Sequence, residues 1–597
     1  MEAGNIDDLL NHITLREKSN TLCLAGKKVS IPQLIAAVKQ HQNIEVTIDP
    51  QAAPRVEAST AHVAAAVERS ESIYGVTTGF GGMASQRIQA VNACQLQSNL
   101  LSFLAAGSGS EIDSRHTRAA MLLRANVLLQ GCSGIRLEII DRLLDFFNHN
   151  AIPTVREFGS IGASGDLVPL SSIARAVTGV AGKAKVNFDD EILDSKTVLR
   201  KLDLEPIELL PKEGLALVNG TSFSSAIAAN AVYESTNLMA LSLATQSMML
   251  RALEAHEGPF DPFVHQAKPH PGQIWSANIL KSWLAGSESR TSHSMQNGST
   301  SNGAANGAAT NGSANNGSNG KPHPAKPVQD RYSIRCSPQY LGSIVEGIAR
   351  VHQTIEIEMN SVSDNPLIDP ESGRFHQSGN FLGQYIGVAM DDLRRFNGLL
   401  AKHLDVQIAS LVAPEFNGGL PASLRGNEER TFNMGLKGLQ ITGNSIMPML
   451  TYLGNPLVEH YPTHAEQFNQ NINGLSWGAA NLAWKSVEYF QQYMAVSLVF
   501  AVQSLDLRAK SNHSHFDGRK LLGPLAEQVY TAVYDALNVA PGEAKPFLFD
   551  DSDRWLEEDI EILGKNIADE GTIVDAVRPI LDSFAAEFLS GGSVKSP

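Results

Sequence analysis

The chain has 597 residues, of which 43% are hydrophobic, and it carries a formal net charge of −15 with a pI near 5.6. This length and composition predict a globular protein with a large buried core. The acidic balance argues against nucleic-acid binding, which needs Lys and Arg gathered into a basic patch, so the expected partners are small molecules or further copies of the chain.

The N-terminus and the cysteines indicate the compartment. The opening MEAGNIDDLLNHITL lacks the basic and long apolar regions of a secretory signal. The cysteines, Cys23, Cys94, Cys132 and Cys336, lie far apart and form no CxxC or Cys/His cluster, so neither disulfides nor a metal site are expected. The run YMAVSLVFAVQSL is shorter than the ~20 apolar residues that cross a bilayer. We therefore expect a cytoplasmic protein with reduced thiols and no membrane partner.

In chain order, the first elements that the pattern indicates are two strands, at KVSIPQL (28–34) and IEVTID (44–49). Helix-period spacing of apolar residues then recurs in four long stretches, at 231–255, 340–362, 385–412 and 479–510. Apolar residues on more than one side of a long helix need neighbours all round. We therefore predict a mainly α fold with a long central helix bundle, in which subunits pack against one another.

Residues 286–327 interrupt this helical pattern. They are dominated by Asn, Gly, Ser and Ala, so they cannot bury enough apolar surface to offset their conformational entropy. A flexible loop and a domain linker both fit this composition, and the loop is favoured because similar helical patterning resumes beyond it. The predicted organisation is an N-terminal domain over 1–225, a central bundle over 226–285 and 328–520, the insert, and a C-terminal helical segment over 521–597.

Small residues gather in the stretch GSIGASGDLVPL (159–170), where Ala163, Ser164 and Gly165 precede an apolar run. A turn before a helix explains this stretch when it is taken alone. The glycines supply turn conformations that other residues resist, and Asp166 or Ser164 would cap the helix that follows. Only its combination with other motifs favours a functional reading.

Four further polar clusters lie at the ends of predicted elements, where loops on a rigid scaffold commonly carry function. They are YGVTTGFGG (74–82), LALVNGTSF (215–223), VQDRYSIRCSPQY (328–340) and HAEQFNQNIN (464–473), the last of which reads as the opening of a long helix. The first lacks the G-x-G-x-x-G spacing and βαβ context of a dinucleotide site, so no nucleotide is expected there. Each cluster taken alone also has an ordinary structural explanation.

Together with Ala163-Ser164-Gly165, these clusters resemble the aromatic amino-acid ammonia-lyase family, most closely its bacterial phenylalanine ammonia-lyases. The resemblance runs from about residue 15 to the C-terminal helices, and it implies the fold of that family, with an N-terminal domain that bears the electrophile. It also implies that the tripeptide cyclises into a methylidene-imidazolone (MIO), with loss of two waters and no external cofactor. Gly165 leaves its nitrogen unhindered, Ala163 adds no bulk, and Ser164 carries the hydroxyl to be eliminated.

The resemblance also implies the roles of individual residues. Tyr74 would remove the β-proton of the substrate, which requires a lowered phenol pKa or a stabilised phenolate. Arg335 would hold the substrate carboxylate bidentately. Gln470 is expected one helical turn from Glu466. The remaining positions expected around the electrophile, carboxylate, amine and ring are Asn219, Gln329, Tyr332, Asn365, Phe381, Lys437 and Glu466, with Asn219 and Tyr332 among the catalytic residues.

Substrate choice depends on LLSFLAAGSG (101–110). In the family the pair at positions 103 and 104 tends to be Phe-Leu in phenylalanine enzymes, His-Leu in tyrosine enzymes and Ser-His in histidine enzymes. Phe103 and Leu104 therefore indicate phenylalanine, although an apolar pair also suits any helical core.

The function that the resemblance implies is deamination of L-phenylalanine to trans-cinnamate and ammonia. The alternatives are a phenylalanine 2,3-aminomutase, a tyrosine ammonia-lyase and a non-catalytic scaffold with the same fold. The insert lies directly before Tyr332 and Arg335, and a mobile wall there favours the lyase, because a mutase must retain cinnamate. The resemblance further implies a homotetramer whose active sites take residues from three chains.

Overall fold

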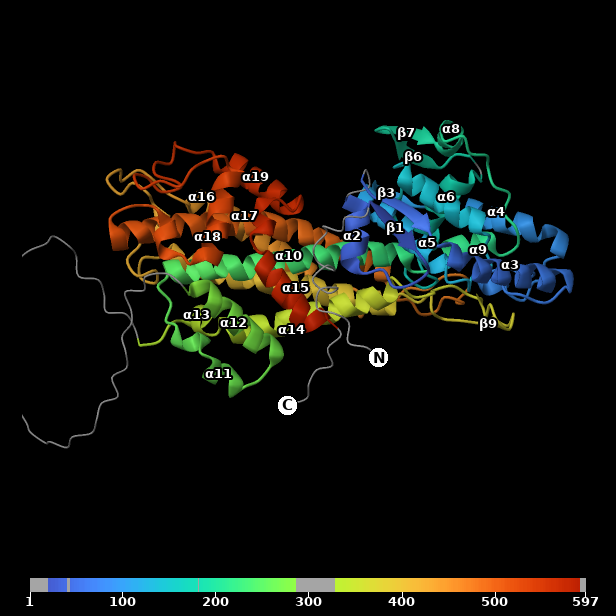
Figure 1. The fold of residues 1–597 in the computed structure, drawn as a ribbon, viewed down its shortest axis with the longest axis horizontal. Coiled ribbons are helices and arrows are strands. Elements are labelled where there is room, and N and C mark those ends of the chain that lie inside the picture. The colour runs from blue at the N-terminus through green and yellow to red at the C-terminus, as the bar shows by residue number, and fades with distance from the viewer. Residues whose placement is uncertain (1–19, 40–42, 181, 286–327, 591–597) are drawn as a thin grey trace, which may run out of the picture.

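The structure of the protein is a computed structural model that describes residues 20–39, 43–180, 182–285 and 328–590 (Figure 1). The predicted flexible insert, 286–327, lies outside the described residues. The molecule is elongated, with the N-terminal elements at the right of Figure 1 and a bundle of long helices that extends to the left.

The N-terminal part combines short strands with medium-length helices. Its elements are β1 (Thr21–Leu24), α2 (Ile31–Lys39), β2 (Glu45–Ile48), α3 (Ala53–Glu68), α4 (Ala93–Phe103), β3 (Ser108–Glu111), α5 (Ser114–Leu128), α6 (Leu137–Asn148), β4 (Ile152–Pro153), β5 (Arg156–Phe158), α7 (Leu167–Thr178), β6 (Lys185–Phe188), β7 (Glu191–Asp194), α8 (Ser195–Lys201) and α9 (Glu213–Val218). β1 pairs in parallel with β2, β3 is antiparallel to β5, and β4, β6 and β7 form an antiparallel sheet in that order.

One of the two predicted strands is wrong. IEVTID contains β2 as expected, but KVSIPQL enters helix α2 at Ile31. The apolar residues Ile31, Leu34, Ile35 and Val38 are all buried, which is the spacing of one helix face rather than of a strand. The predicted strand ended at Leu34, so it did not include Ile35 and Val38, which complete the helical spacing.

The bundle is built from five long helices, α10 (Ser222–Ala252), α14 (Ser337–Glu358), α15 (Gln384–Leu411), α16 (Lys437–Leu453) and α17 (Ser476–His513). The remaining elements are α11 (Pro262–Gln266), α12 (Pro271–Leu284), α13 (Tyr332–Arg335), β8 (Leu367–Ile368), β9 (Phe375–His376), α18 (Pro524–Ala536), α19 (Leu556–Ala568), α20 (Thr572–Asp575) and α21 (Arg578–Phe584), with short 3-10 or π turns between some of them. The predicted mainly α fold with a long central bundle is confirmed.

Helices α10 and α17 form the centre of this bundle and pack along each other. Almost every residue of α10 is buried, including small polar residues such as Ser235 and Ser242, so the helix has no solvent face. Its 31 residues make it about 46 Å long, at 1.5 Å per residue. α10 therefore connects the N-terminal part of the molecule to the opposite end of the bundle, and it runs unbroken across the predicted domain boundary at 225 (Figure 1).

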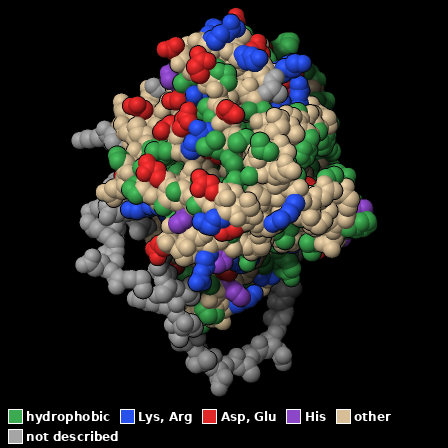
Figure 2. All heavy atoms as spheres, turned by 90° about the vertical axis from the view of Figure 1, so that its right-hand side faces the viewer, with side chains coloured by type: hydrophobic (Ala, Val, Ile, Leu, Met, Phe, Trp, Pro, Cys, Tyr) green, Lys and Arg blue, Asp and Glu red, His purple; other side chains and the backbone are tan. Residues whose placement is uncertain are grey.

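The end of the molecule formed by the N-terminal elements is shown in Figure 2. Acidic and basic side chains are interspersed over this face, with hydrophobic groups between them. Within the described ranges, no helix is long and apolar enough to cross a membrane.

Candidate active site

The tripeptide Ala163-Ser164-Gly165 lies in the loop between β5 and α7, and other parts of the chain converge on it. Gly165 has a φ of +68°, and a Cβ atom there would lie 2.1 Å from the carbonyl oxygen of Gly220. Only glycine fits this position. The Gly165 N–H donates to the carbonyl oxygen of Phe381 at 2.8 Å, and the Asp166 N–H donates to that of Gly220 at 2.8 Å.

Asn219 contacts the serine of the tripeptide directly. It follows the last residue of α9, as the predicted turn requires, and is 2% exposed. Its side-chain Nδ2 donates to the Ser164 carbonyl oxygen at 3.0 Å and lies 3.1 Å from the Ser164 Oγ. The structure therefore brings Asn219 together with the tripeptide, from a separate segment of the chain.

Asp166 follows the tripeptide and is fully buried. Its Oδ2 accepts from the backbone N–H of Ser224 at 2.7 Å and from the Ser224 hydroxyl at 2.9 Å, and its Oδ1 accepts from Ser160 at 3.2 Å. Burial raises the pKa of Asp166 to about 6, and these hydrogen bonds oppose that rise. Asp166 makes no side-chain hydrogen bond to cap α7, so it ties the loop to α10 instead of serving as the expected helix cap.

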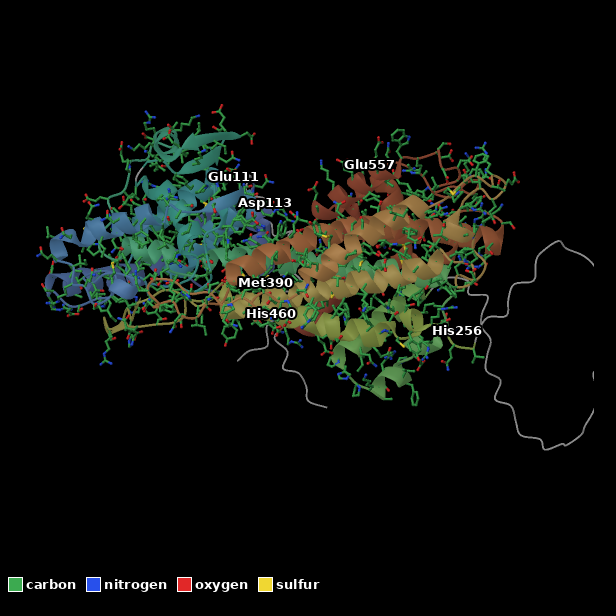
Figure 3. All side chains as sticks on the ribbon, turned by 180° about the vertical axis from the view of Figure 1, so that it is seen from behind. Glu111, Asp113, His256, Met390, His460 and Glu557 are labelled. Atoms are coloured by element: carbon green, nitrogen blue, oxygen red, sulfur yellow. The ribbon has the colours of Figure 1, made fainter. Side chains whose placement is uncertain are left out.

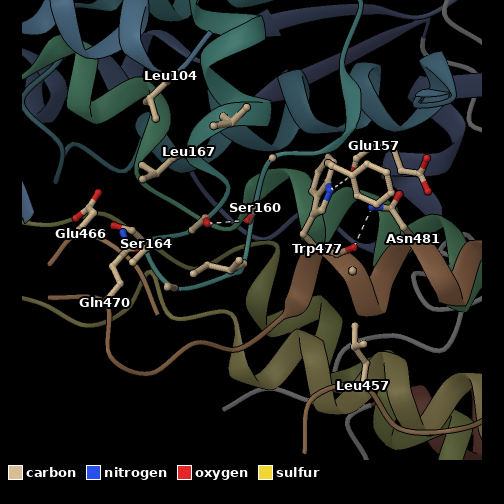
Figure 4. Close-up of a pocket in the computed structure, with 18 of the residues that line it drawn as sticks. Leu104, Glu157, Ser160, Ser164, Leu167, Leu457, Glu466, Gln470, Trp477 and Asn481 are labelled. Carbon is tan, nitrogen blue, oxygen red and sulfur yellow. Dashed lines mark hydrogen bonds between the residues drawn. The ribbon is translucent and has the colours of Figure 1, made fainter. Parts of the chain in front are cut away.

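A cavity of about 670 Å³ opens beside the tripeptide (Figure 4). Ala163, Ser164 and Gly165 line it, together with Leu104 from the end of α4. The other lining residues are Glu157, Phe158, Gly159, Ser160, Ile161, Leu167, Val168, Leu457, Ala465, Glu466, Gln470, Trp477, Gly478, Asn481 and Leu482. Its surface is therefore largely apolar, with a carboxylate and an amide close to Ser164.

Glu466 and Gln470 do not lie on a helix, although the sequence suggested one. Residues 466–468 all have positive φ angles, the backbones of Ala465 and Gln470 pair across a turn, and α17 begins only at Ser476. The polar spacing of this stretch therefore belongs to a turn. Burial raises the pKa of Glu466, and a hydrogen bond with Gln470 opposes the rise.

Tyr74 lies in a loop that touches Glu466. A Cβ atom on Gly81 would lie 2.0 Å from the Glu466 Oε2, and the Gly81 N–H donates to the Tyr74 hydroxyl at 2.9 Å. Burial, with a smaller contribution from the charge of Glu466, raises the pKa of Tyr74, and the Gly81 N–H lowers it. The net shift is upward, opposite to the lowering expected for a phenolate base, and the Gly81 N–H acts against it.

Several predicted site residues lie at the other end of the bundle. Asp330 accepts from the His256 N–H at 2.7 Å, just beyond the C-terminal end of α10, whereas Ser224 near the start of α10 contacts Asp166. Figure 3 labels His256 at the end of the bundle opposite Glu111, which belongs to the N-terminal part. Within one chain the residues Gln329, Tyr332 and Arg335 are therefore separated from the tripeptide by roughly the length of α10. Lys437 begins α16 toward the same end, because the Leu436 N–H donates to the Ser423 carbonyl oxygen, and the Ser423 N–H donates to that of Val412 at the end of α15. This end of α15 contacts Ser333 through Gln407.

In this distant cluster Arg335 is half-buried, and the other predicted residues are exposed. Tyr332 is 72% exposed, and the Arg335 guanidinium lies 4.7 Å from the centre of its ring. Arg335 Nε donates to the Asp330 carbonyl oxygen at 3.0 Å. Gln329 and Lys437 are also exposed. In one chain the Gln329, Tyr332 and Lys437 side chains are thus accessible at the surface, beside the half-buried Arg335.

Three further predicted residues lie near the tripeptide but do not line the cavity. Asn365 is buried, and its Oδ1 accepts from the Ser378 N–H at 2.7 Å, which orders the segment that leads to Phe381. Phe381 contributes its carbonyl oxygen rather than its ring. Phe103 is 58% exposed, whereas its neighbour Leu104 lines the cavity.

Sequence reasoning missed several residues that the structure places here. Trp477 and Asn481 lie one turn apart on α17, and Asn481 Nδ2 donates to the Trp477 carbonyl oxygen at 3.0 Å (Figure 4). Val168 and Leu457 add to the apolar wall. Arg124 was missed as well. The signal that could have indicated it is the single charge within the apolar run AAMLLRANVLLQ.

The described part of the chain contains no group of three or more His, Cys, Asp or Glu side chains that could hold a metal ion. The four cysteines are free.

Comparison with known proteins identifies the family. The profile of the family described as aromatic amino acid lyase matches residues 29–535. A phenylalanine ammonia-lyase of Nostoc punctiforme is 44% identical over 97% of this chain and 99% of its own length. A phenylalanine aminomutase of Taxus chinensis is 34% identical over 85% of this chain and 71% of its own length. The crystal structure of a histidine ammonia-lyase from Trypanosoma cruzi matches with a TM-score of 0.78 and 26% identity, over 97% of this chain and 98% of that one.

The chain therefore belongs to the aromatic amino acid lyase family. It is an enzyme of the ammonia-lyase type, with the fold shared by histidine and phenylalanine ammonia-lyases. The family, the fold class and the enzyme class expected from the sequence are confirmed.

Proposed function

We propose that this enzyme converts L-phenylalanine to trans-cinnamate and ammonia, and that its electrophile forms from Ala163-Ser164-Gly165. The observation that carries the proposal is the position of the tripeptide at the wall of a largely apolar cavity, with the Asn219 amide on Ser164. The residues fit an MIO, because a side chain at position 165 would collide with the Gly220 backbone and the chain must bend there to bring the reacting atoms together.

The cyclisation balances within the chain. The Gly165 nitrogen bonds to the Ala163 carbonyl carbon, and the Ala163 oxygen leaves as water with the protons of the Gly165 and Ser164 amides. The Ser164 hydroxyl leaves as a second water with the Ser164 Cα proton. Asn219, whose Nδ2 lies 3.1 Å from Ser164 Oγ, is placed to stabilise the departing hydroxyl.

The MIO supplies an electrophilic methylene that turns the substrate amine into a better leaving group. The chain's own residues bind the substrate and move its protons. Leu104, Leu167 and Val168 form an apolar wall that suits an aromatic ring and excludes water. Glu466 and Gln470 lie close to where the amine would bind, and Tyr74 accepts the β-proton as its phenolate.

The apolar wall favours phenylalanine over tyrosine. A tyrosine hydroxyl pressed against Leu104 or Val168 would lose its water without gaining a hydrogen bond, at a cost of roughly 1 to 3 kcal/mol. That difference corresponds to discrimination between about 5-fold and about 150-fold. Tyrosine deamination is therefore a minor activity in this proposal.

We further propose that the active site is completed in a homotetramer, whose distant cluster supplies Arg335 and Tyr332 to another chain's cavity. Two observations support this proposal. The distant cluster lies roughly the length of α10 from the tripeptide of its own chain, and α16 exposes an apolar face. On that face Ile441 is 66% exposed and Tyr452 is 72% exposed, which is more than a soluble helix normally presents. The four free cysteines support a reducing compartment such as the cytoplasm.

The second candidate function is a 2,3-aminomutase, favoured by the similarity to the Taxus chinensis enzyme. Both activities begin with loss of ammonia from phenylalanine, and they differ in whether ammonia returns to the β-carbon. The deciding experiment incubates the enzyme with L-phenylalanine and separates the products by chromatography. The lyase gives trans-cinnamate and ammonia in equal amounts, and accumulation of β-phenylalanine as the main product would establish the mutase instead.

A further inference from the structure

A buried arginine lies behind the turn that carries Asn219. Arg124 belongs to α5 and is 1% exposed. Its Nη2 donates to the Asn219 carbonyl oxygen at 2.9 Å and also to the Ala216 carbonyl oxygen. A Cβ atom on Gly220 would lie 2.2 Å from Arg124 Nη1, so the guanidinium lies directly against the backbone of this turn.

Burial at this position disfavours the charged form of the Arg124 guanidinium. Arg124 Nε and Nη1 find no hydrogen-bond partner among the described residues, and burial lowers the pKa of Arg124. The charges of Asp364 and Asp166 oppose that shift, and Asp364 is itself paired with buried Lys212 at 2.8 Å. A buried ion group of this kind contributes little net stability compared with apolar side chains of the same volume. The contacts of Arg124 therefore indicate that it holds the backbone of the Asn219 turn in place.

The turn held by Arg124 has two contacts with the tripeptide loop. The Asn219 side chain donates to Ser164, and the Gly220 carbonyl oxygen accepts from the Asp166 N–H. We propose that Arg124 is a positioning residue, which fixes the turn at residues 219 and 220 so that the Asn219 amide meets Ser164. Arg124 does not line the cavity, so its effect passes through Asn219. This inference rests on the proposed function of the tripeptide.

Two substitutions separate positioning from bulk stability. Arg124→Lys keeps the positive charge, but its shorter side chain ends before the carbonyl oxygens that Nη2 reaches. Arg124→Met removes the charge and keeps an extended apolar stem. Arg118→Met is the matched control, because Arg118 is a second buried arginine of α5, and it donates to Val38 and Asn150 rather than to the turn.

Each variant is purified as the assembled enzyme and examined by two measurements. Intact mass gives the fraction of chains that are lighter by two waters, and steady-state kinetics with L-phenylalanine give kcat and KM. For Arg124→Lys we expect a smaller cyclised fraction and a kcat about 100-fold below wild type, as small displacements of catalytic groups produce. KM should stay within about twofold, since Arg124 takes no part in holding the substrate. Arg118→Met should leave the cyclised fraction and kcat unchanged.

A double-mutant cycle tests the route through Asn219. Asn219→Ala removes the amide on which Arg124 acts, so adding Arg124→Lys to it should reduce kcat by no more than about twofold further. Full additivity of the two substitutions would overturn the inference, because it would mean that Arg124 acts elsewhere.

The remaining outcomes are also decisive. If Arg124→Met does not yield folded enzyme, Arg124→Lys decides alone. Complete cyclisation and a kcat within about twofold of wild type in Arg124→Lys would overturn the inference while leaving the proposed function intact. A wild-type chain that is active but retains its full mass would instead overturn the proposed electrophile, and this inference with it.

Discussion

At the scale of single residues, Tyr74 is subject to opposing influences. Burial and the charge of Glu466 raise its pKa, and the Gly81 N–H lowers it. In the proposed mechanism Tyr74 must be deprotonated to accept the β-proton, so kcat/KM should increase with pH as Tyr74 ionises. The raised pKa places this increase on the alkaline side.

Removing the carboxylate next to Tyr74 should move this pH dependence. Glu466→Gln eliminates the charge that disfavours the phenolate, so the rise in kcat/KM is expected at lower pH than in wild type. The measurement is the pH profile of kcat/KM for both proteins. Gln470→Asn, which changes no charge, serves as control. A profile that stays in place or moves to higher pH in Glu466→Gln would show that Tyr74 is not the group that titrates.

Phe103 allows a test of substrate choice. Phe103→His should raise the ratio of kcat/KM for tyrosine to that for phenylalanine, because an imidazole can hydrogen-bond the phenol and remove a penalty of roughly 1 to 3 kcal/mol. Since Phe103 is 58% exposed in one chain, this outcome requires that the assembled enzyme bring it beside the ring. An unchanged ratio in an assembled variant that carries its electrophile would exclude residue 103 from the ring pocket.

At the scale of elements, the sequence predicted four of the five long bundle helices and missed α16. The predicted starts of α14, α15 and α17 lie within three residues of the observed ones, whereas that of α10 is nine residues late. α10 begins at Ser222, well before the predicted 231, because its first turns consist mainly of Ser and Ala, which give only a weak apolar period. Those small residues are buried by neighbouring helices, which a single sequence does not reveal. The stretch 464–473 was wrongly read as the opening of a helix because its polar spacing resembles a solvated face, whereas positive φ angles at 466–468 make it a turn.

Asp506, on α17, joins this helix to α18 and to the segment at Phe547. It is fully buried and accepts hydrogen bonds from the Tyr530 hydroxyl, from the Tyr534 hydroxyl at 2.6 Å and from the Phe547 N–H at 2.7 Å. Burial raises the pKa of Asp506 from 3.8 to about 7, against the effect of these donors. The folded state therefore retains a proton that the unfolded state releases, and stability falls as pH rises from about 4 to about 7.

Substitution of Asp506 should separate its hydrogen bonds from its charge. Asp506→Ala leaves three buried donors without an acceptor and is expected to cost about 3 kcal/mol or more. Asp506→Asn keeps an acceptor and cannot ionise, so it should lose less stability and flatten the decline of Tm between pH 4 and pH 7. Thermal unfolding at one scan rate across this pH range measures both. Equal destabilisation by Ala and Asn, with the slope unchanged, would contradict this account.

At the scale of the whole molecule, the predicted site divides into two groups. The structure brings Tyr74, Asn219, Glu466 and the tripeptide into one neighbourhood, where the loops and turns that carry them meet. The sequence could not reveal that Gln329, Tyr332, Arg335 and Lys437 lie toward the other end of the bundle. Motif order along the chain carries no information on which end of a 31-residue helix a loop occupies.

Mixed assemblies test whether two chains share one site. Ser164→Ala and Arg335→Gln should each be nearly inactive alone, since one lacks the electrophile and the other the carboxylate anchor. Co-expressed, they should recover up to about a quarter of wild-type activity, because random assembly restores some sites that combine an intact Ser164 with an intact Arg335. Size-exclusion chromatography confirms assembly of each variant. Mixed assemblies as inactive as their parents would show that both residues must come from the same chain.

The central claim is that Ala163-Ser164-Gly165 becomes the electrophile, and intact-mass spectrometry of active enzyme tests it most directly. The chain should be lighter than its translated sequence by two water molecules, with the loss confined to the peptide that contains residues 163–165. Ser164→Ala, which retains the Gly165 turn, should not lose the second water and should have almost no activity. An active wild-type chain with the full translated mass would contradict the account.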